Sequence, residues 1–230
     1  AVLDRAEALE PALNAFVVLD GDGAMDQARA VEAKMAKGEA VGPLAGIPVT
    51  IKDLAVTADL PTQRGSHSMK GEVFGTDTPF VSRLRQAGAI VLGKTTTSEF
   101  GWKGVSQSPL TGITHNPWKS GYNAGASSAG AGVAAAAGYG PLHQGSDGAG
   151  SIRMPSHFCG VFGIKPSLGR VPSWPVSNTD QVSHNGPMTR SVMDSAMMLK
   201  VMAGPHPWDH YTLEAPPADY PAMLRKGVRG

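Results

Sequence analysis

The chain has 230 residues, of which 41% are hydrophobic and 17% are charged, and its formal net charge is +1. This composition is typical of a globular protein rather than a disordered one. The small net charge of mixed signs gives no electrostatic reason to expect binding to nucleic acid or to an anionic membrane. A single cysteine, Cys159, excludes an internal disulfide and a metal site built from cysteines alone, and it fits a reducing compartment such as the cytoplasm.

Both ends of the sequence are typical of a portion of a longer chain. The first residue is Ala1 rather than a methionine and lies inside a helical pattern, and the last segment, "YPAMLRKGVRG", ends on a basic turn. No signal peptide opens the chain, and no apolar run reaches membrane-spanning length. We expect one large domain over residues 1–230, truncated on its C-terminal side.

The spacing of apolar residues predicts alternating helices and strands in the first half of the chain. Helices are expected over residues 2–14, 24–37 and 79–87, and Gly38 and Gly88 are placed to end the last two. Short apolar runs predict strands at "AFVVLD", "IPVTI" and "AIVLGK".

The second half continues the same alternation. The segment "SSAGAGVAAAAG" predicts a helix dense in small residues, followed by a strand at "YGPLHQGSD", a helical start at "SIRMPSHF" and a strand at "GVFGIKP". Residues 191–203 predict a helix with an apolar face of Met, Val and Leu, closed by Gly204, and the Pro-rich stretch at 205–221 is expected to be a loop. The pattern indicates an α/β protein with a buried, mostly parallel or mixed sheet.

The first candidate functional residue is Lys52, at the end of the predicted strand in "IPVTIKDL". Such a lysine is most often a surface residue whose amine reaches solvent, or one that pairs with a neighbour such as Asp53. The alternative is a buried amine whose pKa is lowered by desolvation, so that it can be neutral and act as a base.

Two small-residue stretches carry candidate serines. "NAGASSAGAG" is typical of a tight loop entering a helix, with Ser127 or Ser128 as N-cap. In "HQGSDGAGSIRMPS", three residues without bulk (Gly148, Ala149 and Gly150) leave backbone N–H groups uncovered just before a hydroxyl, that of Ser151. A phosphate loop is disfavoured because its lysine pattern is absent. Acyl transfer needs this combination of a nucleophile beside N–H donors for an oxyanion.

These stretches, with others in the same order, resemble segments of the amidase signature family. The further segments are "GPLAGIPVTIKD", "RLRQAGAIVLGKT", "SEFGW", "THNPW", "CGVFGIKPSLGRV" and "GPMTRSV", and the resemblance runs from about residue 43 to residue 203. It implies an α/β fold whose mixed sheet is covered by helices on both faces. It also implies amide hydrolysis by a Ser–cis-Ser–Lys triad, without a metal or another cofactor.

Carried over by position, the resemblance gives each motif residue a role. Lys52 matches the base, Ser151 the nucleophile, and Ser127 the bridging serine whose preceding peptide bond is cis. The resemblance places the oxyanion hole at the backbone N–H groups of Gly148, Ala149, Gly150 and Ser151. It places supporting residues at Ser128, Asp147 and Arg153. The family usually has glycine where this chain has Ala126, Ala129 and Ala149, and a methyl there would narrow the hole or require an ordinary φ angle.

Other functions remain open at this point. The same machinery serves a glutaminase-type subunit of a tRNA-dependent amidotransferase, or a hydrolase of carbamates or esters, and an inert scaffold domain is the alternative outside enzymes. A Ser–His–Asp hydrolase is disfavoured because no GxSxG motif surrounds Ser151, although His143 and His157 lie nearby in sequence. The expected partner is a small amide substrate, with a homodimer as the candidate assembly.

Three further expectations concern individual side chains. Cys159, in the apolar run "FCGVFG", is expected to be a buried packing residue. Phe100, Trp102 and Met154 are candidates for the near wall of the substrate pocket, with ordinary packing as the alternative for each.

Overall fold

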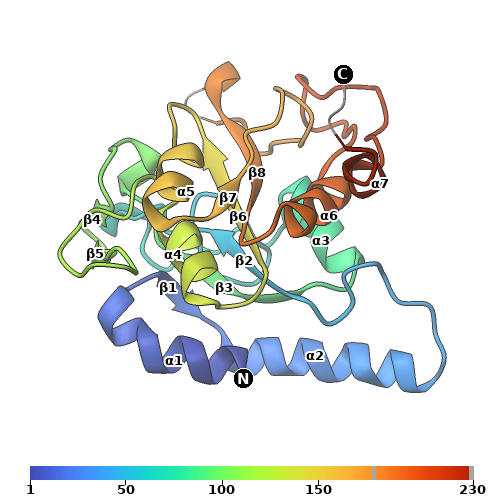
Figure 1. The fold of residues 1–230 in the computed structure, drawn as a ribbon, viewed down its shortest axis with the longest axis horizontal. Coiled ribbons are helices and arrows are strands. Elements are labelled where there is room, and N and C mark those ends of the chain that lie inside the picture. Colours follow the sequence, from blue (N-terminus) through green and yellow to red (C-terminus); the bar gives the residue numbers. More distant parts are fainter. Residues whose placement is uncertain (178–179, 228–230) are drawn as a thin grey trace.

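A six-stranded mixed sheet forms the centre of the molecule (Figure 1). The computed structural model describes residues 1–177 and 180–227. The strand order is β1-β3-β2-β6-β8-β7. The strands are β1 (Phe16–Leu19), β2 (Pro48–Lys52), β3 (Ile90–Thr95), β6 (Leu142–Asp147), β7 (Phe162–Gly163) and β8 (His184–Thr189). Strand β2 runs parallel to β3 and to β6, whereas β1, β7 and β8 pair antiparallel with their neighbours. The predicted α/β class with a mixed sheet is confirmed.

Helices cover both faces of this sheet. The helices α1 (Val2–Leu13), α2 (Gly21–Ala36) and α4 (Ala129–Ala137) pack in one hydrophobic cluster with β1 and β3. The helices α3 (Pro79–Gln86) and α6 (Val192–Met202) pack in the other cluster with β2, β3 and β6. Strand β3 serves both clusters, because Val91 belongs to one and its neighbours Ile90 and Leu92 to the other. This alternation is what a strand buried on both faces requires.

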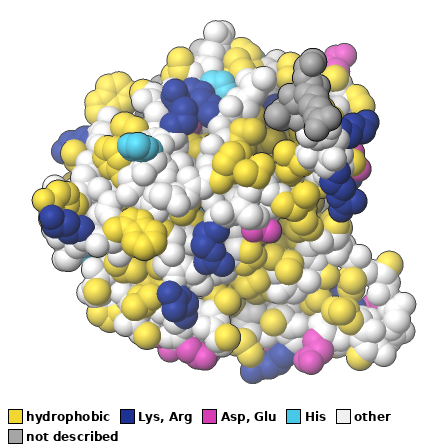
Figure 2. Space-filling model, viewed as in Figure 1, with side chains coloured by type: hydrophobic (Ala, Val, Ile, Leu, Met, Phe, Trp, Pro, Cys, Tyr) yellow, Lys and Arg dark blue, Asp and Glu magenta, His cyan; other side chains and the backbone are white. Residues whose placement is uncertain are grey.

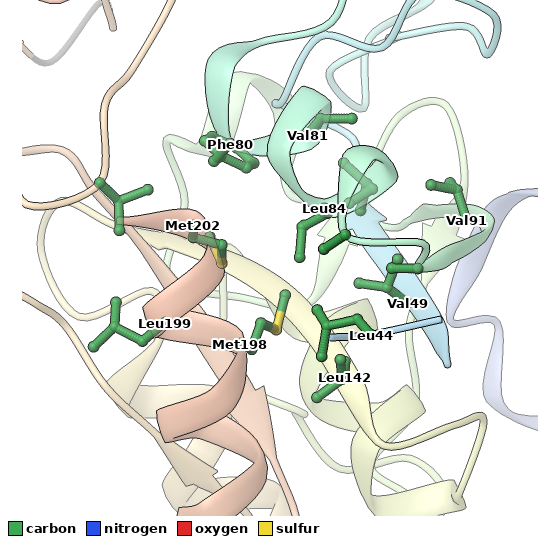
Figure 3. Close-up of a cluster of buried hydrophobic side chains, with 14 of the residues drawn as sticks. Leu44, Val49, Phe80, Val81, Leu84, Val91, Leu142, Met198, Leu199 and Met202 are labelled. Carbon is green, nitrogen blue, oxygen red and sulfur yellow. The ribbon is translucent and has the colours of Figure 1, made fainter. Parts of the chain in front are cut away.

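Two methionines of α6, Met198 and Met202, pack in the core, as the predicted apolar face requires, whereas Met197 is exposed. Figure 3 shows Met198 and Met202 facing Phe80 and Leu84 of α3 across the cluster. Both methionine side chains are fully buried. Packing of this kind holds α3 and α6 on the sheet, and it leaves the ends of β2 and β6 free to carry polar residues.

Strand β8 and the start of helix α2 are two places where the fold differs from the sequence prediction. Strand β8, with the sequence "HNGPMT", was not predicted, because Asn, Gly and Pro are all poor strand formers. It is formed because β6 pairs with it from His143 to Asp147. Helix α2 begins at Gly21, earlier than predicted, because the Asp20 carboxylate accepts the N–H of Gly23 as an N-cap.

The remaining elements are short. A two-stranded hairpin pairs β4 (Gln107–Ser108) with β5 (Gly112–Ile113), and α5 (Arg153–Cys159) follows β6. Helix α7 (Tyr220–Leu224) begins at the end of the stretch expected to be a loop. Single 3₁₀ turns lie at His67–Met69, Glu99–Gly101 and Asp180–Val182.

The surface in Figure 2 carries charges of both signs, spread among apolar atoms rather than gathered in one basic patch. This agrees with the net charge of +1. Within the described residues, none of the helices combines the length and apolar character needed to span a bilayer.

Gly130 in α4 allows the helix to approach the sheet closely. A Cβ at this position would fall on the backbone oxygen of Ala15 and 2.5 Å from the backbone nitrogen of Thr96. We expect Gly130→Ala to lower the free energy of unfolding by about 1–3 kcal/mol, because neither backbone group can move aside cheaply. Urea denaturation measures this change. The control is Gly104→Ala, where a Cβ meets nothing within 4 Å, and equal stability of the two variants would contradict the expectation.

Candidate active site

Three chain segments meet at one edge of the sheet. Strands β2 and β6 are parallel, so their carboxyl ends lie at the same edge, and these ends are Lys52 and Asp147. The loop that precedes α4 brings Ser127 to this edge, and the loop between β6 and α5 brings Ser151. Ligand sites in α/β proteins commonly form at the carboxyl ends of parallel strands.

Lys52 is buried, with 0% of its surface exposed. Its Nζ lies 2.7 Å from Ser127 Oγ, 3.0 Å from Ser146 Oγ and 3.4 Å from the Ser146 carbonyl oxygen. Burial lowers the pKa of the amine to about 7, against the opposing effect of the Asp147 charge. An amine with this pKa is neutral in a large fraction of molecules near pH 7, as a general base must be.

Asp53 does not pair with Lys52. Its carboxylate accepts the N–H groups of Gln63 and Gly65 and lies 4.0 Å from the amine of a second buried lysine, Lys94. Burial raises the pKa of Asp53 to about 6 and lowers that of Lys94 to about 8. Because Asp53 contacts Lys94 and the loop after β2, it is not an ion-pair partner of Lys52. Because Lys52 is fully buried, it is not a surface residue either.

The serine pair before α4 serves two different contacts. The Ala126–Ser127 peptide bond is cis, as the resemblance implies, and Ser127 directs its hydroxyl to Lys52. Ser128 occupies the N-cap position of α4 without a capping hydrogen bond. Its hydroxyl instead donates to the carbonyl of Ser146, 3.0 Å away, and accepts the N–H of Ser146 at 3.1 Å. Ser128 therefore ties the serine loop to β6.

Ser127 and Ser151 line one cavity of about 670 Å³. The chain segments that bear them are joined by a hydrogen bond from the Ser128 N–H to the Ser151 carbonyl, 3.2 Å long. Within the described part of the chain, the two hydroxyls of Ser127 and Ser151 do not hydrogen-bond to each other. A proton relay between them needs a Ser151 rotamer that closes this gap, and such contacts commonly tighten only when substrate is bound.

The loop after β6 is organised around the Asp147 carboxylate. It accepts the N–H groups of Gly150 at 2.7 Å and Ile152 at 3.1 Å, and the Arg153 Nε at 2.9 Å. Burial acts to raise the pKa of Asp147, but the hydrogen bonds from Arg153 and from the backbone hold it well below its usual range. Asp147 and Arg153 are thus hydrogen-bonded to each other, and Asp147 also to the backbone of this loop.

This geometry differs from the expected oxyanion hole at one residue, Gly150. The N–H of Gly150 is engaged by Asp147, so it is not available to a substrate in this conformation. Gly148, Ala149 and Ser151 line the 670 Å³ cavity, whereas Gly150 is not among its lining residues. Sequence alone could not make this distinction, because it depends on which way each peptide plane faces.

The near wall of the cavity is aromatic and apolar. Phe100, Trp102 and Met154 all line it, in agreement with their expected position, and Trp102 is 76% exposed. Phe100 has a φ of 49°, an uncommon conformation for a bulky residue, and its N–H donates to the carbonyl of Arg64 at 2.8 Å. Phe100 is thus fixed on the wall by its backbone.

The three alanines that replace the family's usual glycines do not have a positive φ angle. Ala126, Ala129 and Ala149 are absent from the described residues that combine a side chain with positive φ. Ala126 and Ala129 are buried, and Ala149 lines the cavity. The ordinary φ angle expected for these positions is therefore what the structure has.

Two histidines and the cysteine near Ser151 play no part in the cavity. His143 is buried, with Nδ1 3.0 Å from Thr50 Oγ1 and Nε2 3.1 Å from the Gly140 carbonyl, and burial lowers its pKa to about 4. His157 is exposed on α5. Cys159 is fully buried, and burial raises the pKa of its thiol to about 12. Neither histidine hydrogen-bonds to Ser151 in the described chain.

Sequence reasoning missed two contributors to the site. Ser146 accepts hydrogen bonds from Lys52, and Lys165 donates to the carbonyl of Gly148 at 2.9 Å. Ser146 and Lys165 both stand inside segments quoted above, so their positions were usable signals, but the contact of Lys165 with Gly148 depends on how the chain folds back after α5. Among residues 1–177 and 180–227, no three His, Cys, Asp or Glu side chains cluster closely enough to hold a metal ion.

Comparison with known proteins identifies the family. The sequence model of the family described as Amidase matches residues 1–228. The chain belongs to the amidase signature family. The match extends beyond the segments quoted above, to both ends of the described chain.

Individual amidase relatives agree with this assignment. An acylamidase from Rhodococcus erythropolis is 42% identical over 231 residues, which cover 100% of this chain and 48% of the acylamidase. One subunit of the glutamyl-tRNA(Gln) amidotransferase of Rhodopirellula baltica is 43% identical over 230 residues, covering 99% of this chain and 46% of that protein. The crystal structure of a bacterial aryl acylamidase matches with a TM-score of 0.91 at 34% identity, over 100% of this chain and 48% of that one. This chain spans about half the length of these relatives.

The burial of Lys52 makes stability depend on pH. Between its folded pKa of about 7 and its ordinary value of 10.5, the unfolded chain binds a proton that the folded chain does not. Stability contributed by Lys52 therefore rises with pH through this window and is flat below it. We expect the free energy of unfolding of wild type, relative to Lys52→Met, to increase from about pH 7 to about pH 10 in urea denaturation.

The matched control is Lys200→Met, which removes an exposed lysine paired with Asp219. Its difference from wild type should stay nearly constant over the same range. A constant difference for Lys52→Met as well would mean that Lys52 is not desolvated.

Proposed function

We propose that this chain carries the catalytic centre of an amide hydrolase in which Ser151 is the nucleophile, Ser127 the proton relay and Lys52 the base. The observation that carries the proposal is a buried amine with a pKa of about 7, placed 2.7 Å from the hydroxyl of Ser127. Membership of the amidase signature family supports it. Since the chain spans about half the length of its relatives, activity and substrates belong to the proposal.

The proposed reaction begins when neutral Lys52 accepts the proton of Ser127, which takes the proton of Ser151. The Ser151 oxygen then attacks the amide carbonyl carbon, and the carbonyl oxygen becomes negatively charged. The proton returns through Ser127 to the leaving nitrogen, the C–N bond breaks, and an acyl ester of Ser151 remains. Water hydrolyses this ester by the same relay and restores the serine.

Backbone N–H groups of the loop after β6 are the proposed stabilisers of the oxyanion. Of the four expected donors, Gly148, Ala149 and Ser151 border the cavity, whereas Gly150 donates to Asp147. Donors fixed before the reaction are the ones that lower the barrier, because they need no reorganisation as charge develops. Ser128, Asp147 and Arg153 hold this loop and the serine loop in place.

A second candidate function is the release of ammonia from glutamine for a partner enzyme. The observation that favours it is the similarity, at about 40% identity, to proteins that are subunits of glutamyl-tRNA(Gln) amidotransferases. A glutaminase assay of the full-length protein, with and without partner subunits, separates the two. Glutamine hydrolysis that appears only with partner subunits supports the second candidate. Hydrolysis of simple amides by the protein without partners supports the first.

Carbamate or ester hydrolysis would use the same residues, because both substrates pass through the same acyl-serine chemistry. An inert scaffold is the alternative outside enzymes. A fluorophosphonate probe discriminates it, since an inert domain would leave Ser151 unlabelled.

Location and assembly also remain proposals. We propose a cytoplasmic protein that acts on a small amide and forms a homodimer, within a single domain over residues 1–230. Support for the compartment is the single, buried, unpaired Cys159. Analytical ultracentrifugation of the full-length protein tests the dimer.

The catalytic roles predict distinct losses of activity. Ser151→Ala should abolish hydrolysis of acyl p-nitroanilides by the full-length protein, and Lys52→Met should lower kcat by about 10²–10⁴-fold, the usual contribution of a general base. Ser120→Ala, at an exposed serine, is the control and should keep wild-type rates. Wild-type kcat in either Ser151→Ala or Lys52→Met would refute the assignment.

A further inference from the structure

Lys165 reaches back from the segment after β7 to the loop that carries Ser151. Its Nζ donates to the carbonyl oxygen of Gly148 at 2.9 Å and lies 3.4 Å from Asp147 Oδ1. The side chain is 22% exposed, so most of its length is packed against the protein. These contacts join two segments of the chain across α5.

The bond to Gly148 fixes the direction of a peptide plane. In a trans peptide unit the C=O of one residue and the N–H of the next point in opposite directions. The unit between Gly148 and Ala149 is trans, so an amine that holds the Gly148 carbonyl turns the Ala149 N–H the other way. Ala149 lines the 670 Å³ cavity together with Ser127 and Ser151.

The next two peptide units are fixed in the same alternating manner. The Gly150 N–H donates to Asp147 Oδ1, which turns the second unit over. The Gly150 carbonyl accepts the N–H of Met154 at 2.7 Å, so the Ser151 N–H points away from the start of α5. Within the described residues, the N–H groups of Ala149 and Ser151 have no protein acceptor.

We propose that Lys165 is a positioning residue for the hydrolysis: by holding the Gly148 carbonyl it aims the Ala149 N–H, together with that of Ser151, at the developing oxyanion. The proposal rests on the proposed function, and it concerns two of the three N–H donors that border the cavity. Lys165 touches neither the nucleophile nor the base, so it acts only through the backbone that it holds.

The alternative role for Lys165 is to neutralise the Asp147 carboxylate. Asp147 already accepts two hydrogen bonds from the Arg153 side chain, at 2.9 and 3.0 Å, and further bonds from three backbone N–H groups. The 3.4 Å contact from Lys165 is longer than all of these. The shorter contact of Lys165 is its hydrogen bond to the Gly148 carbonyl, so its main effect is on the orientation of that peptide group.

The test compares Lys165→Met with Lys165→Arg in the full-length protein. Methionine keeps the apolar stem and removes the donor, whereas arginine keeps a donor that can reach the same carbonyl. Rates are divided by the number of active sites titrated with a fluorophosphonate, so that misfolded molecules do not count. Arg170→Met is the control, because Arg170 also donates to a backbone carbonyl, that of Ala215, 2.9 Å away, and it is absent from the lining of the cavity.

We expect Lys165→Met to lower kcat per site by about 10–100-fold, less than the loss of a whole oxyanion donor, while KM changes by less than about threefold. Its affinity for phenylboronic acid, which forms a tetrahedral adduct on a nucleophilic serine, should fall with kcat. Lys165→Arg should recover most of the kcat and most of the boronate affinity. Arg170→Met should match wild type in both.

Each contrary result has a separate meaning. Unchanged kcat and boronate affinity in Lys165→Met would overturn the positioning role while the hydrolase assignment stands. A rise in KM together with a fall in kcat, which Lys165→Arg does not reverse, would also overturn it, because such a combined change indicates a general structural role. A wild-type protein that neither hydrolyses amides nor reacts with the fluorophosphonate would overturn the proposed function itself.

Discussion

Burial of the Lys52 amine, with no carboxylate at ion-pair distance in the described part of the chain, is the constraint on which the rest of the site depends. Among the described residues, the hydrogen-bond partners of the Nζ atom are hydroxyl and carbonyl oxygens, and desolvation lowers the pKa of the amine to about 7. A buried amine can exchange a proton only with a group that is hydrogen-bonded to it, and the Ser127 hydroxyl is such a group. Burying the amine costs free energy, which is offset by the interactions that hold β2, β6 and the serine loop together around it.

The nearby acid is kept from forming an ion pair with this amine. Asp147 raises the pKa of Lys52, yet its carboxylate is taken up by Arg153 and by the backbone of its own loop. The second buried lysine, Lys94, has an acid within 4.0 Å, and its amine is held by the hydroxyl of Thr62 at 2.6 Å. One sheet therefore buries two lysines in different ways, and the one without an acid at ion-pair distance is beside the serines.

Sequence patterns predicted the parts of this arrangement that depend on local spacing. The helices with regular apolar faces, the strand ending at Lys52 and the small-residue loops before Ser127 and Ser151 follow from residue types that are close together in the chain. Strand β8 could not be predicted, because its "HNGPMT" sequence becomes a strand only through pairing with β6. The orientation of the Gly150 N–H was equally hidden, since hydrogen bonding to Asp147 and not residue type decides which peptide groups face the cavity.

The most direct test of the central claim is the rate at which a fluorophosphonate labels Ser151 as a function of pH. If Lys52 is the desolvated base, the second-order labelling rate should rise with pH and level off with an inflection near 7, the pKa of the buried amine. The same titration in Lys52→Met should show a slow rate without this inflection. A wild-type inflection close to 10, the ordinary value for lysine, would contradict the account, as would identical profiles for the two proteins.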